Sequence, residues 1–172
     1  MNGFPGRITI GAAAIGAVAI GALAPAVLAA GDEETGGAPW GRAAVEEIEY
    51  QGQRVVYDVA EDGPDGLSFV LDRASYLNNL YGADPFTTAI VLVLHGDEIP
   101  LFAIENYGDH EELMTRARSL TVGGTIEFRM CEVAARGHGY EPADIHGFVQ
   151  MVPMADAEIV RLQREEDYAY MQ

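Results

Sequence analysis

The chain has 172 residues, with 27 acidic side chains against 10 basic ones and a formal net charge of −17. A hydrophobic content of 49% is typical of a globular protein and not of a disordered one. Nucleic acids and anionic membrane surfaces bind clustered positive charge, so this charge balance excludes them as expected partners.

Residues 1–29 have the three regions of a secretory signal peptide. Arg7 supplies the positive charge, residues 8–24 are apolar, and Val27-Leu28-Ala29 offers small or aliphatic residues for cleavage. We expect cleavage after Ala29 and a periplasmic or otherwise exported location. The alternative is an uncleaved anchor, because residues 8–30 are just long enough to span a bilayer.

Residues 30–50 are rich in glycine and acids and are expected to form a flexible lead-in. Residues 51–172 are expected to form one domain, since roughly 140 residues are enough for one core and too few for two. Within them, β-branched runs alternate with segments of helical period, which is typical of βαβ units. We predict an α/β fold, a single three-layer domain with a mostly parallel sheet of about four to five strands flanked by helices. The expected strands are residues 54–59, 89–94, 126–131 and 148–152.

Three helices are expected between and after these strands. The first follows a turn at residues 62–66, carries apolar residues at 3- and 4-residue spacing, and ends at Gly82. Asp109 and Glu112 predict a capping box at the start of the second. Asp156 is the expected cap of the last helix, whose buried stripe is expected to contain Ile159, Val160, Leu162 and Ala169.

Polar side chains stand where the expected strands end. Asp58 closes the first strand, His95 and Asp97 follow the second, and Cys131 ends the third. The carboxyl ends of parallel strands meet at one edge of a sheet, where ligands and reactive groups gather. We therefore expect these side chains along a common edge.

Cys131 is the single cysteine of the chain and has no partner for an internal disulfide. A reactive thiolate needs nearby positive charge or hydrogen-bond donors. Arg129 lies on the same strand face and could supply charge, and His95 could act as base or donor if its strand adjoins that of Cys131. His138 lies on a loop that could close over the thiol. The alternative is that Cys131 is a small buried hydrophobic residue.

No cofactor or metal is expected. A glycine-rich nucleotide fingerprint is missing after the first strand, and the histidines and acids lack the short spacing of a zinc site.

Five features in chain order resemble the DsrE/DsrF-like family of sulfur-relay proteins, in its periplasmic variant. They are Asn78-Asn79, His95-Gly96 after an apolar strand, Cys131 at a strand end, Val152-Pro153, and the closing Tyr168-Ala169-Tyr170. The chain departs from the family pattern after the cysteine and after the Val-Pro turn, at Glu132-Val133-Ala134 and Met154-Ala155-Asp156.

The resemblance implies a sulfur carrier that bears a persulfide on Cys131, without an organic cofactor. His95 and Arg129 are then the expected tuning groups, and Asn78, Asp97 and His138 the expected ligand-binding residues. The implied partners are sulfur donors and acceptors, and the implied assembly is a homo-oligomer such as a trimer or hexamer. Two alternatives remain open: a non-catalytic oligomeric binding module, and a small-ligand binder at the edge marked by His95 and Asp97.

Overall fold

Five parallel strands form one sheet, in the order β4-β3-β2-β1-β5, in the computed structural model, which describes residues 38–172. The strands are β1 (Arg54–Val59), β2 (Ala89–Leu94), β3 (Ile126–Cys131), β4 (Val149–Val152) and β5 (Ala169–Met171). The first three have the predicted bounds, and the fourth begins one residue later than predicted. The sheet belongs to a unit that spans residues 46–172.

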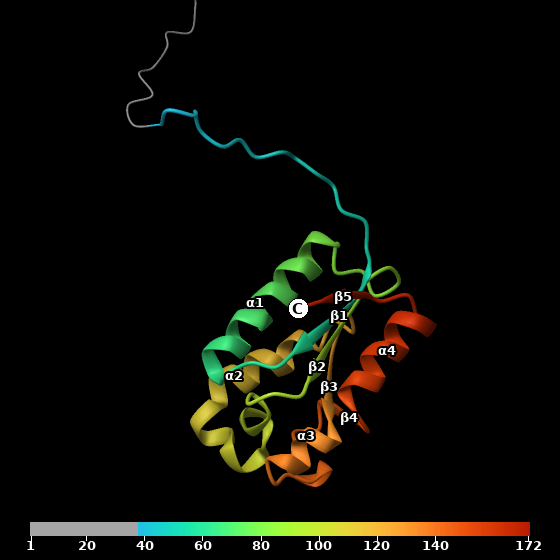
Figure 1. The fold of residues 1–172 in the computed structure, drawn as a ribbon. Helices are drawn as coiled ribbons and strands as arrows, with labels where there is room; N and C mark the ends of the chain where they lie inside the picture. Colours follow the sequence, from blue (N-terminus) through green and yellow to red (C-terminus); the bar gives the residue numbers. More distant parts are fainter. Residues whose placement is uncertain (1–37) are drawn as a thin grey trace, which may run out of the picture. The chain divides into compact units, whose positions relative to one another are not determined.

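Helices cover both faces of this sheet, as Figure 1 shows. Helices α1 (Pro64–Leu80) and α2 (Tyr107–Leu120) lie on one face, and α4 (Ala155–Glu165) lies on the other. Strands β1 to β4 are added in one direction, whereas β5 returns to the far side of β1. Right-handed crossovers therefore require α4 on the face opposite α1 and α2. The predicted three-layer α/β fold is confirmed.

Shorter elements join the strands and helices. Helix α3 (Glu132–Gly137) follows β3 directly, and turns of 3-10 helix occur at η1 (Ile99–Phe102), η2 (Ile104–Asn106) and η3 (Pro142–Asp144). None of the helices within residues 38–172 is long and apolar enough to cross a membrane.

Each face of the sheet has its own apolar core. On the α1–α2 face, alternate residues of the central strands, such as Leu92 and Phe128, pack against Leu67 and Leu71 of α1. On the α4 face, a smaller cluster joins the valines of β1 and β2 to α4 and the C-terminal segment; it contains Val56, Val91, Val93, Cys131, Ala155, Ile159, Leu162 and Tyr168. Strand β2 is buried on both faces, which explains its uninterrupted apolar sequence.

Some predicted helix boundaries hold and others do not. Gly82 has a φ of 78°, and the backbone amides of Gly82 and Ala83 close α1, as predicted. Helix α2, however, begins at Tyr107 with Asn106 as its N-cap, and the predicted start at Asp109 coincides with a kink at His110, where two helical segments meet. A run of 3-10 helix leads into α2 and brings the chain into helical geometry before Asp109 is reached.

The last helix also starts earlier than predicted. Met154 is its N-cap, and Asp156 lies inside the first turn, where a carboxylate still interacts favourably with the helix dipole. Ile159 and Leu162 are buried as predicted, but Val160 is 56% exposed. Ala169 is not part of the helix, because the chain turns at Asp167, where φ is 57°, and enters β5.

Residues 38–50, the described part of the predicted lead-in, contain no helix or strand, and nearly all of them are exposed. The predicted signal peptide, residues 1–29, lies outside the described residues.

Candidate functional site

The carboxyl edge of the sheet gathers polar side chains from three neighbouring strands. In the register of the sheet, Asp58 of β1 is level with Val93, and Leu94 of β2 is level with Met130. His95 and Cys131 each follow by one residue, so they occupy adjacent positions at the ends of β2 and β3. The predicted common edge is confirmed, and β2 and β3 are neighbours, which is the condition under which His95 was expected to act on Cys131.

Asp58 holds two side chains at this edge. His95 Nε2 lies 2.5 Å from one oxygen of the Asp58 carboxylate, and the Tyr170 hydroxyl donates to the other oxygen, also at 2.5 Å. The side chains of Asp58 and His95 are 23% and 28% exposed. The pKa of Tyr170 is raised, chiefly because its hydroxyl donates to the Asp58 carboxylate. A carboxylate that accepts from Nε2 fixes the orientation of the imidazole and leaves Nδ1 as the nitrogen that can exchange a proton.

Cys131 joins β3 to α3 and is 5% exposed. It is the N-cap of α3, and its Sγ accepts a hydrogen bond from the backbone N–H of Ala134 at 3.5 Å. This is the one hydrogen bond that the sulfur makes among the described residues. Helix α3 was not predicted from the sequence, although Glu132 and Arg136 have the i, i+4 spacing of a helical ion pair, which they form at 3.2 Å.

Arg129, the predicted cation beside Cys131, is engaged elsewhere. Its guanidinium binds Glu158 of α4 and Glu127 of its own strand, the latter at 2.8 Å. Burial alone would lower the pKa of Arg129, but the hydrogen bonds to these two carboxylates outweigh it and the net shift is upward. Within the described residues Arg129 makes no hydrogen bond to the thiol. Through Glu158 it links α4 to the sheet, and both of its ion-pair partners are carboxylates.

Two of the three predicted ligand-binding residues lie close together. His138 Nε2, just past the end of α3, is 3.8 Å from Asp97 Oδ1 in the segment after β2. Asn78 is separated from them because α1 leads away from this edge, and Asn78 lies near its far end. Its buried Oδ1 has no hydrogen-bond partner among the described residues.

Sequence reasoning missed Glu98 and Tyr170. Glu98 follows the predicted site residue Asp97 and is fully buried, with its carboxylate bound to backbone amides. Burial raises its pKa, and the amides of Gly96 and Glu61 oppose that shift. Nothing in its surroundings in the sequence distinguishes Glu98 from a solvated surface acid. Tyr170 could be placed only once β5 was known to lie beside β1.

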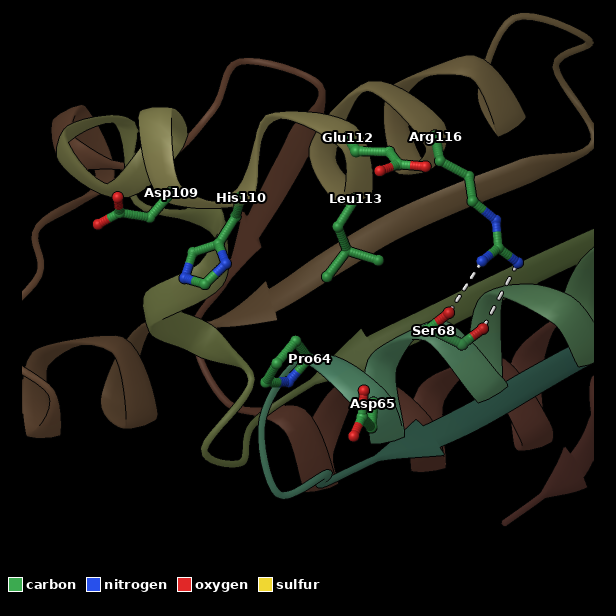
Figure 2. Close-up of a pocket in the computed structure, with 8 residues that line it drawn as sticks. All are labelled: Pro64, Asp65, Ser68, Asp109, His110, Glu112, Leu113 and Arg116. Atoms are coloured by element: carbon green, nitrogen blue, oxygen red, sulfur yellow. Dashed lines mark hydrogen bonds between the residues drawn. The ribbon is translucent and has the colours of Figure 1, made fainter.

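The open hollows of the described surface include one on the other face of the sheet, between α1 and α2 (Figure 2). Its volume is about 300 Å³, and acids from both helices line it, among them Asp65, Asp109 and Glu112. Figure 2 shows Arg116 reaching across to α1, where it donates to Ser68 Oγ at 3.0 Å. Within residues 38–172, no three His, Cys, Asp or Glu side chains are arranged to hold a metal ion.

No protein-family model matches the sequence, and no curated protein matches it. Among solved structures, it is similar to a protein of unknown function, MTH1491, from Methanobacterium thermoautotrophicum. The similarity covers 69% of this chain and 97% of that one, at 26% sequence identity and a TM-score of 0.47. Because that protein's function is unknown, the function of this chain must be argued from its own residues.

Proposed function

We propose that the protein carries sulfur as a persulfide on Cys131, as its resemblance to the DsrE/DsrF-like family implies. One observation carries the proposal: the single thiol stands at the start of α3 with an amide donor on its sulfur, next to a histidine that Asp58 holds in place. A thiol acceptor, a base and an orienting carboxylate are the groups that nucleophilic sulfur chemistry requires.

The transfer needs no external oxidant or reductant. The Cys131 thiolate attacks the outer sulfur of a donor persulfide, R–S–SH, a new S–S bond forms on Cys131, and the donor S–S bond breaks. The donor leaves as a thiol, R–SH, after taking up the proton that the Cys131 thiol gave up. In the second half, an acceptor thiol attacks the outer sulfur in the same way and regenerates the Cys131 thiol.

His95 moves the proton in both halves of this cycle. Its Nε2 is bound to Asp58, so Nδ1 accepts the proton when the thiol becomes a thiolate and returns it to the leaving thiol. Arg129 is left out of this chemistry because two carboxylates neutralise it. Asp97 and His138 lie close together in the segments that follow β2 and α3, and in this proposal they contribute to donor contact.

The burial of the thiol restricts which sulfur donors can reach it. With Cys131 only 5% exposed, we expect the donor to be a small inorganic or low-molecular-weight polysulfide, or a partner protein that opens the start of α3. With the predicted signal peptide, we expect this exchange outside the cytoplasm, where partner proteins would supply and accept the sulfur. The homo-oligomer implied by the family resemblance is part of the same proposal.

Intact mass spectrometry of the native protein after exposure to inorganic polysulfide tests the proposal. A gain of sulfur mass that reductant removes, present in the wild type and absent from Cys131→Ser, is the expected result. If the adduct forms only after unfolding, the thiol is a buried hydrophobic residue and the fold serves as a binding module instead.

A further inference from the structure

Glu98 is a charged side chain in a place where charge is costly. It is 0% exposed, and the only other buried polar residues among those described are Thr88 and Thr125. A buried carboxylate persists when hydrogen-bond donors surround it. The two hydrogen-bond donors to the Glu98 carboxylate show which segments of the chain it connects.

Both donors are backbone amides, one from each of the two strand ends that carry the Asp58–His95 pair. Glu98 Oε2 accepts from the N–H of Glu61, three residues after Asp58, at 2.8 Å. Glu98 Oε1 accepts from the N–H of Gly96, directly after His95, at 3.0 Å. One carboxylate thus bridges the segments that leave β1 and β2.

The two segments approach more closely than a side chain would allow. A Cβ atom at Gly96 would lie 2.6 Å from the Cα of Ala60 and 2.8 Å from its carbonyl carbon. Above this contact, the amide of His95 donates to the carbonyl of Val59 at 3.0 Å, which extends the β1–β2 pairing past the end of β2. The absence of a side chain at Gly96 permits the close approach, and hydrogen bonds to the Glu98 carboxylate hold the two segments together.

We infer that Glu98 is a positioning residue, which holds the ends of β1 and β2 in the spacing that the hydrogen bond between Asp58 and His95 requires. It does not touch a reacting atom, and it acts through the backbone of Gly96 and Glu61. Its importance for sulfur transfer rests on the proposed function, but the hydrogen bond that it sets can be measured without that function.

The test is proton NMR of the His95 imidazole in the full domain, with the Nε2 proton assigned by its disappearance in His95→Gln. A proton donated to a carboxylate exchanges more slowly with water while this charge-assisted hydrogen bond holds. In Glu98→Gln, the side-chain oxygen can still accept from one backbone N–H. The side-chain NH2 group faces the other backbone N–H and cannot accept from it. We expect the Nε2 proton to exchange about tenfold faster, since losing one hydrogen bond changes an opening equilibrium by that order.

Glu98→Asp is the second variant, since it keeps the charge but is too short to reach both amides, and the same change is expected. Glu105→Gln is the matched control, because it removes one exposed negative charge from a nearby turn and should leave the signal unchanged. Folded Glu98 variants with the wild-type shift and exchange rate would overturn the inference. Loss of the His95 Nε2 proton signal in the Glu98 variants would support the positioning role. If the wild type at the same time formed no persulfide, only the proposed function would be refuted.

Discussion

Arg129 contacts one buried and one exposed carboxylate. The contribution of each ion pair to the free energy of unfolding can therefore be measured separately. The side chains of Arg129 and Glu158 are 12% and 11% exposed, whereas that of Glu127 is 53% exposed. Removing one partner of a buried ion pair costs about 3–5 kcal/mol, and an exposed pair contributes about 0–1 kcal/mol. Glu158→Gln leaves Arg129 with Glu127 and some access to water. We therefore expect a loss of about 2 kcal/mol in the free energy of unfolding, below the fully buried range.

Urea denaturation at neutral pH measures this loss, with Glu127→Gln as the matched control on the same arginine. The control should cost less than about 1 kcal/mol. The pKa of Glu158 is lowered, chiefly by its hydrogen bond from Arg161 and further by Arg129, against the effect of burial. Its contribution is therefore complete above the unfolded-state pKa near 4.5 and disappears as the pH falls through the lower folded-state value. Equal losses in the two variants, or a gap that stays constant in acid, would refute the reasoning.

Three further outcomes are expected. Cys131→Ser should change the free energy of unfolding by less than about 1 kcal/mol, because the sulfur makes one weak hydrogen bond; a loss of the folded state would show that the thiol is structural. Tyr170→Phe should remove absorbance from the late part of the alkaline titration, because donation to Asp58 raises the pKa of that phenol; absorbance lost from the early part of the curve would contradict the contact. Burial raises the pKa of Glu98, so its ionisation destabilises the fold, and the wild type should lose stability relative to Glu98→Gln as the pH rises through that pKa. Denaturation curves at several pH values check this last result, and a difference independent of pH would show that the pKa of Glu98 is the same in the folded and unfolded states.

Much of the fold could be predicted from hydrophobic pattern alone. The bounds of β2 and β3 followed from their side-chain patterns. A strand buried on both faces, such as β2, is apolar throughout, and a strand with one polar face, such as β3, alternates. Arg129 packs beneath α4 through Glu158, and Glu127 reaches solvent.

The missed elements are those too short to show a period. Helix α3 has six residues and β5 has three, and the direction of the chain after α4 depends on the backbone at Asp167. Without β5, the edge of β1 has no neighbour in the sequence analysis. Tyr170, 112 residues from Asp58, therefore could not be connected to it.

The site was predicted in its location but not in its contacts. Sheet topology brings Asp58, His95 and Cys131 to one edge, and strand order alone is enough to expect this. The pairing of Arg129 with Glu158 and the burial of Glu98 depend on which helix covers which strand and on how closely two loops approach. Those features arise from tertiary packing, and residue type favoured solvent exposure for both acids.

The central claim is that Cys131 accepts and releases a sulfur atom in the folded protein. Its most direct test is to load the native protein with isotopically labelled polysulfide, remove the excess, add a small acceptor thiol, and follow the label by mass. We expect one labelled sulfur per chain to enter the wild type and pass to the acceptor, Cys131→Ser to take up none, and His95→Gln to transfer more slowly. A native protein that takes up no label, or that keeps it in the presence of the acceptor, would contradict the account.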